Sequence, residues 1–169
     1  METTEKYWNI LQNNNEWQRF SETKASIILT AYGIIISVIY SNSETILPSL
    51  TQSKTVLIIA ILFAILSLVS IIFSFRCLNP NLKNENPTSV IYFGHIAKNN
   101  KDFKEYYSNS KPIIENDESF LEQISEQIFV NSEIAWKKFR RATWSFRAFL
   151  ASIIILTTDV LIHLIENLK

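Results

Sequence analysis

Residues 55–75 read TVLIIAILFAILSLVSIIFSF, a run of 21 residues without a charged side chain. An α-helix of roughly 20 apolar residues crosses the ~30 Å hydrocarbon core of a bilayer. Inside lipid every backbone polar group needs a partner within the protein, and a helix provides one for each. This stretch therefore predicts a transmembrane helix, and it decides the fold class.

Two other apolar blocks flank this run. The earlier block reaches spanning length only by including Lys24 and Asn42, and the later one only by including Asp159 and His163. The segment before the earlier block carries Glu5, Glu16 and Glu22 and two tryptophans, unlike the basic leader of a cleavable signal peptide. We therefore predict three retained membrane spans, at residues 24–42, 55–75 and 146–165.

Composition narrows the class of protein. A chain of 169 residues fits one domain, and its formal net charge of zero does not point to nucleic acid. With only two glycines there is no Gly-rich phosphate loop, and a single cysteine, Cys77, excludes an internal disulfide or a multi-cysteine metal cluster. No zinc spacing or nucleophile–base arrangement is visible. We expect no catalysis, no metal and no cofactor.

Lysine and arginine placement predicts the orientation of the spans. Basic residues lie before the first span, after the second and before the third, whereas the loop between the first two offers only Lys54 and the C-terminal end only Lys169. Cytoplasmic flanks carry the excess of such residues. We therefore predict a cytoplasmic N-terminus and a cytoplasmic segment over 76–145, with the C-terminus outside.

The cytoplasmic segment is predicted to be mostly helical. From Asp117 onward apolar residues recur at three-, four- and seven-residue steps without Gly or Pro, which predicts one helix of about 45 residues or more, roughly 70 Å long, entering the third span. A helix over 101–107 is expected to end at Lys111-Pro112, and the Asn-Pro stretches within 79–87 indicate turns. Residues 90–93 fit either a short strand or a broken helix.

The predicted fold is an all-α membrane protein with a small cytoplasmic helical lobe, in which the third span continues a long cytoplasmic helix. It forms one domain over residues 1–169. Its parts are an N-terminal helix (1–23), the spans at 24–42, 55–75 and 146–165, and a lobe with its stalk helix (76–145).

Several polar and aromatic residues are candidates for function. Asp159 and His163 are four residues apart on one helix face and would form a costly polar pair in lipid, so they either line a pore or oligomer interface or lie at the membrane surface. Glu22 and Lys24 point in different directions on a helix. An aromatic–basic belt at the membrane surface accounts for Trp136, Trp144, Phe146 and Phe149 with the neighbouring lysines and arginines.

Two sequence blocks resemble a known family. Residues 15–25, NEWQRFSETKA, resemble the "WI-x-FADTKA" motif at the first membrane helix of the transmembrane effectors of Pycsar anti-phage systems, and residues 89–97, SVIYFGHIA, resemble the "YFGxIA" block after the second. The helix over 120–139 also fits, and the resemblance covers roughly residues 10 to 165. Ser21-Glu22 stands where the motif has Ala-Asp, which keeps the acid but places it on a longer side chain.

The resemblance implies a sensor and effector in one chain. In that family a partner pyrimidine cyclase makes a cyclic pyrimidine mononucleotide, cUMP or cCMP, during phage infection. The effector, a multi-pass protein of the bacterial inner membrane, senses it on the cytoplasmic side and damages the membrane, which ends in abortive infection. The expected partners are this cyclic nucleotide, membrane lipid and further copies of the chain in a homo-oligomer, with no nucleic acid.

The two blocks together form the candidate ligand site. A ligand with one phosphate charge suits a cation with a hydroxyl beside it, and its base suits an aromatic face. The alternative is that Glu22, Lys24 and His95 only tie the stalk to the membrane base. The residues in question are Arg19, Glu22, Thr23, Lys24, Tyr92, Phe93, Gly94 and His95.

Two other classes of protein stay open. One is a membrane effector gated by a cyclic oligonucleotide from another defence pathway. The other is a structural or accessory membrane protein without a ligand. A neighbouring cyclase gene, or titration with both classes of nucleotide, would separate the three.

Overall fold

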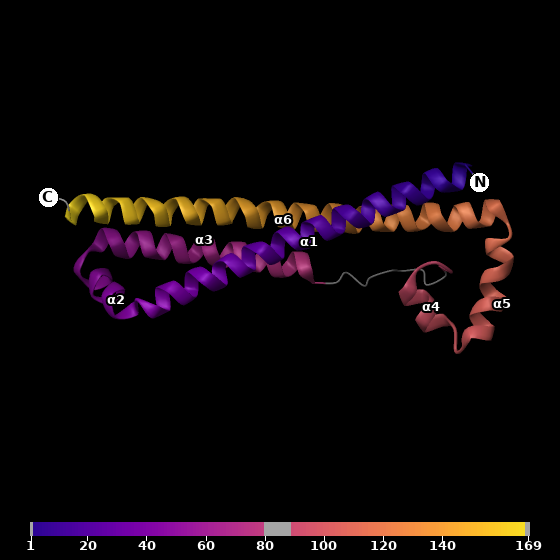
Figure 1. Ribbon diagram of the computed structural model, residues 1–169, viewed down its shortest axis with the longest axis horizontal. Coiled ribbons are helices and arrows are strands. Elements are labelled where there is room, and N and C mark those ends of the chain that lie inside the picture. The colour runs from indigo at the N-terminus through magenta and orange to yellow at the C-terminus, as the bar shows by residue number, and fades with distance from the viewer. Residues whose placement is uncertain (1, 80–88, 168–169) are drawn as a thin grey trace. The chain divides into compact units, whose positions relative to one another are not determined.

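The computed structural model describes residues 2–79 and 89–167 and is helical throughout almost all of them. Figure 1 labels six helices in this part of the chain, and no strand occurs in it. They are α1 (Glu2–Ser41), α2 (Ser43–Gln52), α3 (Lys54–Leu78), α4 (Phe93–Asn99), α5 (Phe103–Ile114) and α6 (Asp117–Asn167). The all-α prediction is confirmed.

Three helices, α1, α3 and α6, are long and apolar enough to cross a membrane, judged by length and composition. They contain the three predicted spans, apart from Asn42, which follows the end of α1. Helix α1 runs without a break from the N-terminal segment into the first span, and α6 is a single helix of 51 residues. Because neither contains proline and α6 lacks glycine as well, nothing in their sequence interrupts the backbone hydrogen bonds. The predicted continuity of the third span with a long helix is confirmed.

Three local predictions need correction or completion. Pro112 lies inside α5, so the prediction that Lys111-Pro112 ends that helix is wrong. Its missing N–H removes one hydrogen bond in the last turn, where Glu115 N still donates to Lys111 O at 3.0 Å. The expected loop between the first two spans is helix α2, and residues 90–93 lead into α4 rather than forming a strand. The turns predicted after Asn79 lie outside the described residues.

The chain divides into two compact units. The membrane unit, residues 20–79 and 138–167 as described, holds the three apolar segments, which lie side by side in Figure 1. The lobe unit, residues 2–19 and 89–137 as described, holds α4, α5 and the N-terminal parts of α1 and α6. Helices α1 and α6 contribute to both.

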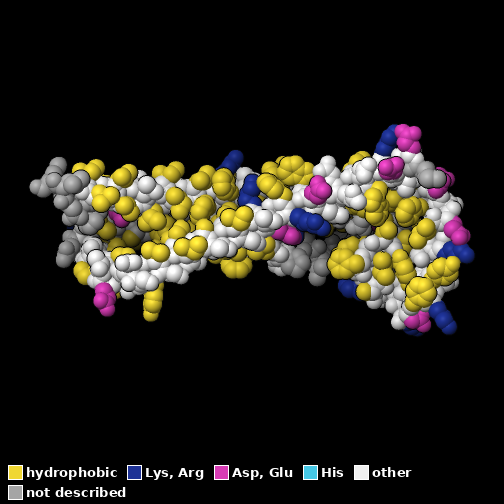
Figure 2. Space-filling model, viewed as in Figure 1, with side chains coloured by type: hydrophobic (Ala, Val, Ile, Leu, Met, Phe, Trp, Pro, Cys, Tyr) yellow, Lys and Arg dark blue, Asp and Glu magenta, His cyan; other side chains and the backbone are white. Residues whose placement is uncertain are grey.

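Mostly small residues form the interior of the membrane unit, with Ile28, Tyr32 and Lys138 as larger buried members. Ala25, Cys77 and Ala142, one from each long helix, make its buried cluster. The large aliphatic side chains of α3 are mostly exposed, as Figure 2 shows for one face. Membrane helices associate through such small residues, because lipid already solvates the large apolar ones. The pattern is that of a three-helix membrane bundle.

Candidate functional site

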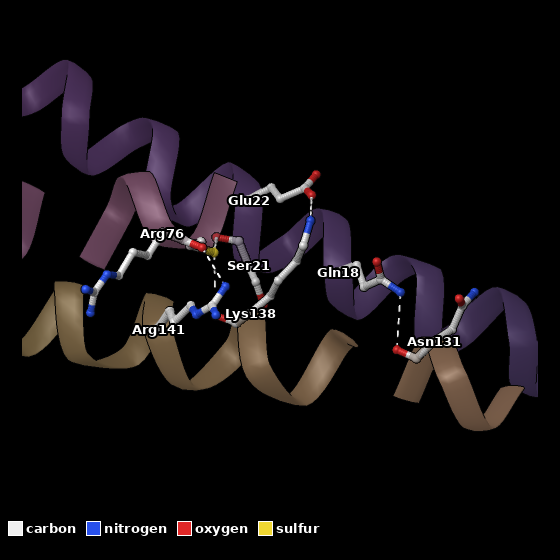
Figure 3. A network of polar contacts seen from close by, with 8 residues as sticks. Gln18, Ser21, Glu22, Arg76, Asn131, Lys138 and Arg141 are labelled. Atoms are coloured by element: carbon white, nitrogen blue, oxygen red, sulfur yellow. Dashed lines mark hydrogen bonds and ion pairs between the residues drawn. The ribbon is translucent and has the colours of Figure 1, made fainter. Parts of the chain in front are cut away.

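A buried ion pair joins α1 to α6 in the membrane unit. Lys138 Nζ donates to Glu22 Oε1, as Figure 3 shows. The Lys138 side chain is only 8% exposed and that of Glu22 is 38% exposed. A buried ammonium needs such a partner, since an unpaired charge in a low-dielectric interior is strongly unfavourable. Glu22 therefore pairs with another residue of the protein, as expected if it serves to connect the stalk to the membrane base.

Helix α3 ends against this ion pair. Cys77 Sγ lies 3.5 Å from the backbone carbonyl oxygens of both Ser21 and Lys138, within reach of a thiol hydrogen bond to either. Arg141 donates to the carbonyl oxygen of Arg76 at 2.7 Å, near the C-terminal end of α3 (Figure 3). A cation there satisfies a terminal carbonyl and complements the helix dipole. These hydrogen bonds join α1, α3 and α6 near the C-terminal end of α3.

Serine hydroxyls continue the contact between α3 and α6. Ser70 Oγ donates to the carbonyl oxygen of Ser145 at 2.8 Å, and Ser74 Oγ lies 2.6 Å from Ser145 Oγ. Tyr32 of α1 reaches Ser152 of α6 at 2.9 Å. All five residues are buried. Hydrogen bonds of this kind between membrane helices contribute about 0.6 kcal/mol each, so they fix register more than they add stability.

Lys24 lies beside aromatic rings instead of a carboxylate. Its Nζ is 4.5 Å from the centroid of the Phe20 ring, one turn earlier in α1, and 5.7 Å from that of Phe146 in α6. Within the described residues it forms no ion pair. Arg19 and Thr23 are exposed on the same helix. This segment therefore presents positive charge at Lys24 that is not paired with an acid among the described residues.

The second sequence block lies in the lobe unit, around the start of α4. His95 is buried, and its Nδ1 accepts a hydrogen bond from Ser89 N at 3.2 Å. The Tyr92 ring stands edge-on to His95, with 4.9 Å between the ring centroids. A side chain at Gly94 would bring its Cβ within 2.8 Å of the Tyr92 ring, so glycine lets the ring lie close. Phe93, by contrast, is 72% exposed.

The candidate residues are thus divided between the units. Glu22, Thr23 and Lys24 belong to the membrane unit, whereas Arg19 and residues 92–95 belong to the lobe unit. In the lobe, His95 and Tyr92 stabilise the turn before α4, while Phe93 is available to a ligand. That the two blocks form one site stays a prediction.

The polar residues of the third span are on α6. Asp159 is partly exposed and makes no hydrogen bond or ion pair with the described residues. His163 lies one turn further along α6, and its side chain is outside the part of the structure that is described. Among the described residues no group of three metal-ligating side chains occurs.

The sequence analysis did not single out Lys138, the buried serines or Tyr32. Lys138 belongs to the basic run KKFRR, residues 137–141, which the sequence pattern assigns to a cytoplasmic flank and to an aromatic–basic belt at the membrane surface. Two sequence patterns could have identified Lys138 and the buried serines of α3. Ser67, Ser70 and Ser74 recur at three- and four-residue steps on one face of α3, and Ala135, Lys138, Ala142 and Ser145 do the same on α6.

Comparison with known proteins identifies the family. Residues 6–165 match the Pycsar effector protein domain, PycTM. The Pycsar effector protein PtPycTM of Propioniciclava tarda is similar, with 25% identity over 157 residues that cover 90% of this chain and 74% of that protein. No solved structure matches the chain significantly. The chain belongs to the Pycsar effector protein family, whose transmembrane members are effectors of anti-phage defence.

Proposed function

We propose that this protein senses a cyclic pyrimidine nucleotide, cUMP or cCMP, on the cytoplasmic side of the bacterial inner membrane and then disrupts that membrane, causing abortive infection. The observation that carries the proposal is the family match across residues 6–165, which includes both sequence blocks and all three apolar segments. The two compact units act as one effector domain over residues 1–169, because α1 and α6 contribute to both. The protein acts through binding and conformational change, without catalysis.

The proposed ligand site uses the cations of α1 for the phosphate. Lys24 supports this role because its charge lies against the rings of Phe20 and Phe146 and has no carboxylate partner among the described residues. Arg19 and the hydroxyl of Thr23 provide further donors. Phe93 supplies an exposed aromatic face for the base. Glu22 contributes by holding Lys138, and Tyr92, Gly94 and His95 by shaping the turn that presents Phe93.

Replacing Lys24 with alanine is expected to weaken nucleotide binding by roughly ten- to 150-fold, since a hydrogen bond to a charged group contributes about 1.5–3 kcal/mol. Membrane insertion should be unchanged. Isothermal titration of the purified full-length chain with cUMP and with cCMP measures the loss. Lys6→Ala, which removes an exposed lysine of the same helix, is the matched control. Normal binding by a Lys24→Ala chain that no longer inserts would make the segment structural.

The direct test of the function uses purified protein in vesicles loaded with a fluorescent dye. We expect leakage with cUMP or cCMP, and none with a cyclic dinucleotide or with buffer. Leakage with the dinucleotide alone would assign the protein to a different signalling pathway. Leakage that is the same without any nucleotide would contradict the sensor role.

The proposed topology places the N-terminus and the lobe in the cytoplasm. Cysteine labelling of intact cells, in a Cys77→Ser background, is expected to modify a cysteine at Lys169 and to leave one at Asp102 unmodified until the cells are opened. Asp102 is exposed at the start of α5, so protection would reflect the membrane and not burial. Labelling of both positions in intact cells would eliminate the three-span orientation.

Nucleotide binding can drive membrane damage only if the ligand prefers one arrangement of the helices over another. Helices α1 and α6 each continue from the lobe unit into the membrane unit, so a change in either helix has a covalent route between them. Three helices are too few to enclose a pore. We therefore propose a homo-oligomer in which binding reorders α6, with Asp159 and His163 among the groups that meet water.

A further inference from the structure

The lobe unit exposes large aromatic side chains whose exposure cannot be explained by contact with lipid. Phe129 and Phe103 are 68% and 75% exposed. Phe129 precedes the predicted third span by seventeen residues, roughly 25 Å of helix, whereas the headgroup layer is only about 6 Å deep. Exposed apolar surface of this kind outside a membrane marks a site of contact with another molecule.

One such surface lies on α6 and is acidic. Its residues recur at three-, four- and seven-residue steps, so they share one face of the helix, away from the face that carries Ala135 and Lys138. Residues 117–136 contain five acidic side chains and no lysine or arginine. We call this the acidic face; all of its members are exposed: Glu118, Glu122, Glu126, Phe129, Glu133 and Trp136.

The second surface lies on α5 and is basic. The rings of Phe103 and Tyr107 stack with 6.0 Å between their centroids, and Lys111 Nζ lies 5.7 Å from the centroid of Tyr107. In Figure 2 hydrophobic side chains gather over α4 and α5, with both basic and acidic side chains at the margin. We call this the basic face; its exposed members share one side of the helix: Phe103, Lys104, Tyr107, Lys111 and Ile114.

The acids near the basic face are already engaged locally. Asp102 Oδ1 accepts a hydrogen bond from Glu105 N at 2.9 Å, and Glu105 Oε2 accepts one from Lys101 N at 2.7 Å. Lys111 is paired with Glu115 at 3.7 Å, an exposed pair that contributes little. The face that carries Phe103 and Tyr107 presents Lys104 and Lys111, and the carboxylates of Asp102, Glu105 and Glu115 lie beside it.

We propose that the basic face of one copy of this chain binds the acidic face of the next. Each face combines exposed rings with charges of predominantly one sign, and the two signs are opposite, so a second copy complements both at once. Glu133 of the acidic face is paired with Lys137 at 3.4 Å and Lys111 of the basic face with Glu115 at 3.7 Å, and both pairs are exposed and can exchange partners. The contact is head-to-tail, and copies inserted in one membrane share an orientation, so repetition about the membrane normal generates a ring when the rotation between copies closes. This contact rests on the proposed function in one respect only, that the protein forms a homo-oligomer.

No other class of partner fits both faces. An anionic lipid surface would attract the lysines of α5 but repel the glutamates of α6. A polyanion such as nucleic acid would meet the same repulsion. A basic protein would match α6 and be repelled by α5. A second copy of this chain carries both complementary faces and therefore matches the two together.

Disulfide trapping between differently tagged chains tests the head-to-tail contact. In a Cys77→Ser background, one chain carries Lys104→Cys and the other Glu126→Cys, and the full-length chains are mixed in lipid nanodiscs, with and without cCMP or cUMP. We expect the mixed crosslink to exceed either self-crosslink by about tenfold. Self-crosslinking of Glu126→Cys that equals the mixed product, or no preference with or without nucleotide, would overturn the proposal.

Charge reversal provides an independent measurement. Glu126→Lys with Glu133→Lys should weaken self-association by about tenfold or more, and adding Lys104→Glu with Lys111→Glu should restore it. Glu2→Lys with Glu5→Lys, the same charge change elsewhere on the lobe unit, should have little effect. Failure of the second pair of changes to restore association would contradict the pairing of these faces.

Nucleotide titration of the same chains separates this inference from the proposed function. If the crosslink forms but no cyclic pyrimidine nucleotide binds, the contact stands and the sensor role fails. If the nucleotides bind and the vesicles leak without the crosslink, the function stands and this interface is wrong.

Discussion

Glu22→Gln is expected to lower the free energy of unfolding of the membrane unit by about 2 kcal/mol. Removing one partner of a buried ion pair typically costs 3–5 kcal/mol, because the other charge is left without compensation. The loss here should be smaller, since Glu22 is 38% exposed and water can approach the pair. Lys138, at 8% exposure, would still lose its only ion-pair partner among the described residues.

Replacing the other partner of the ion pair, Lys138, should lower the free energy of unfolding by less. In Lys138→Met the remaining group is Glu22, which can turn toward water, whereas in Glu22→Gln the remaining ammonium lies between helices. The double variant Glu22→Gln/Lys138→Met should approach the wild type, because it leaves no uncompensated charge between the helices. We therefore expect Lys138→Met to be more stable than Glu22→Gln.

Chemical unfolding of the purified chain in detergent, followed by tryptophan fluorescence, measures these differences. Glu16→Gln, which neutralises an exposed acid of α1, is the matched control and should unfold like the wild type. Equal stabilities for Glu22→Gln and wild type would mean that Lys138 finds another partner. Equal losses in the two single variants would contradict the asymmetry in exposure.

The sequence predicted the long-range layout of the chain because that layout depends on simple properties. The uncharged run at residues 55–75 and the absence of Gly and Pro from 117–167 each determine a helix without reference to the rest of the molecule. Pro112 shows the limit of such local rules, since proline near the end of a helix removes only one hydrogen bond and does not require a break.

The interior of the membrane unit could not be predicted in the same way. Lys138 lies among four other basic residues within 137–147, and nothing in their order shows that it alone is buried against an acid of another helix. Its burial follows from sharing a face with Ala135 and Ala142, and Ala142 is in contact with α1 and α3 through Ala25 and Cys77. A hydropathy count likewise treats Ser70 and Ser74 as interruptions, although they form the contact with α6.

Sequence reasoning also had no means to relate the two family blocks to each other. Residues 15–25 and 89–97 are far apart in the chain, and no periodicity connects them. Their shared side of the membrane is a prediction from basic residues, which determine topology but not distance. What the structure adds is local: the turn at Gly94 presents Phe93, and the rings near Lys24 hold its charge in place.

Asp159→Leu is expected to abolish nucleotide-induced leakage while leaving nucleotide binding unchanged. An ionised carboxylate at the centre of a membrane helix costs about 2.5–3.5 kcal/mol unless it meets water or protein. Asp159 is partly exposed and has no hydrogen bond or ion pair with the described residues, so in lipid it would favour any rearrangement that brings water to it. Leucine removes that preference and favours the state in which α6 faces hydrocarbon.

The control for this variant is Thr158→Leu, which changes the neighbouring exposed residue of α6 without removing a charge. Thr158 Oγ1 bonds to the carbonyl oxygen of Ile154 in its own helix, so its loss should leave the backbone intact. Dye release from vesicles and nucleotide titration are measured on the same preparations. If Asp159→Leu leaks like the wild type, then Asp159 lies at the membrane surface, and the damaging step belongs to α1 or α3. If Asp159→Leu alone releases no dye and still binds nucleotide, then binding and permeabilisation are separate steps. In that case a charge on α6 is needed for permeabilisation.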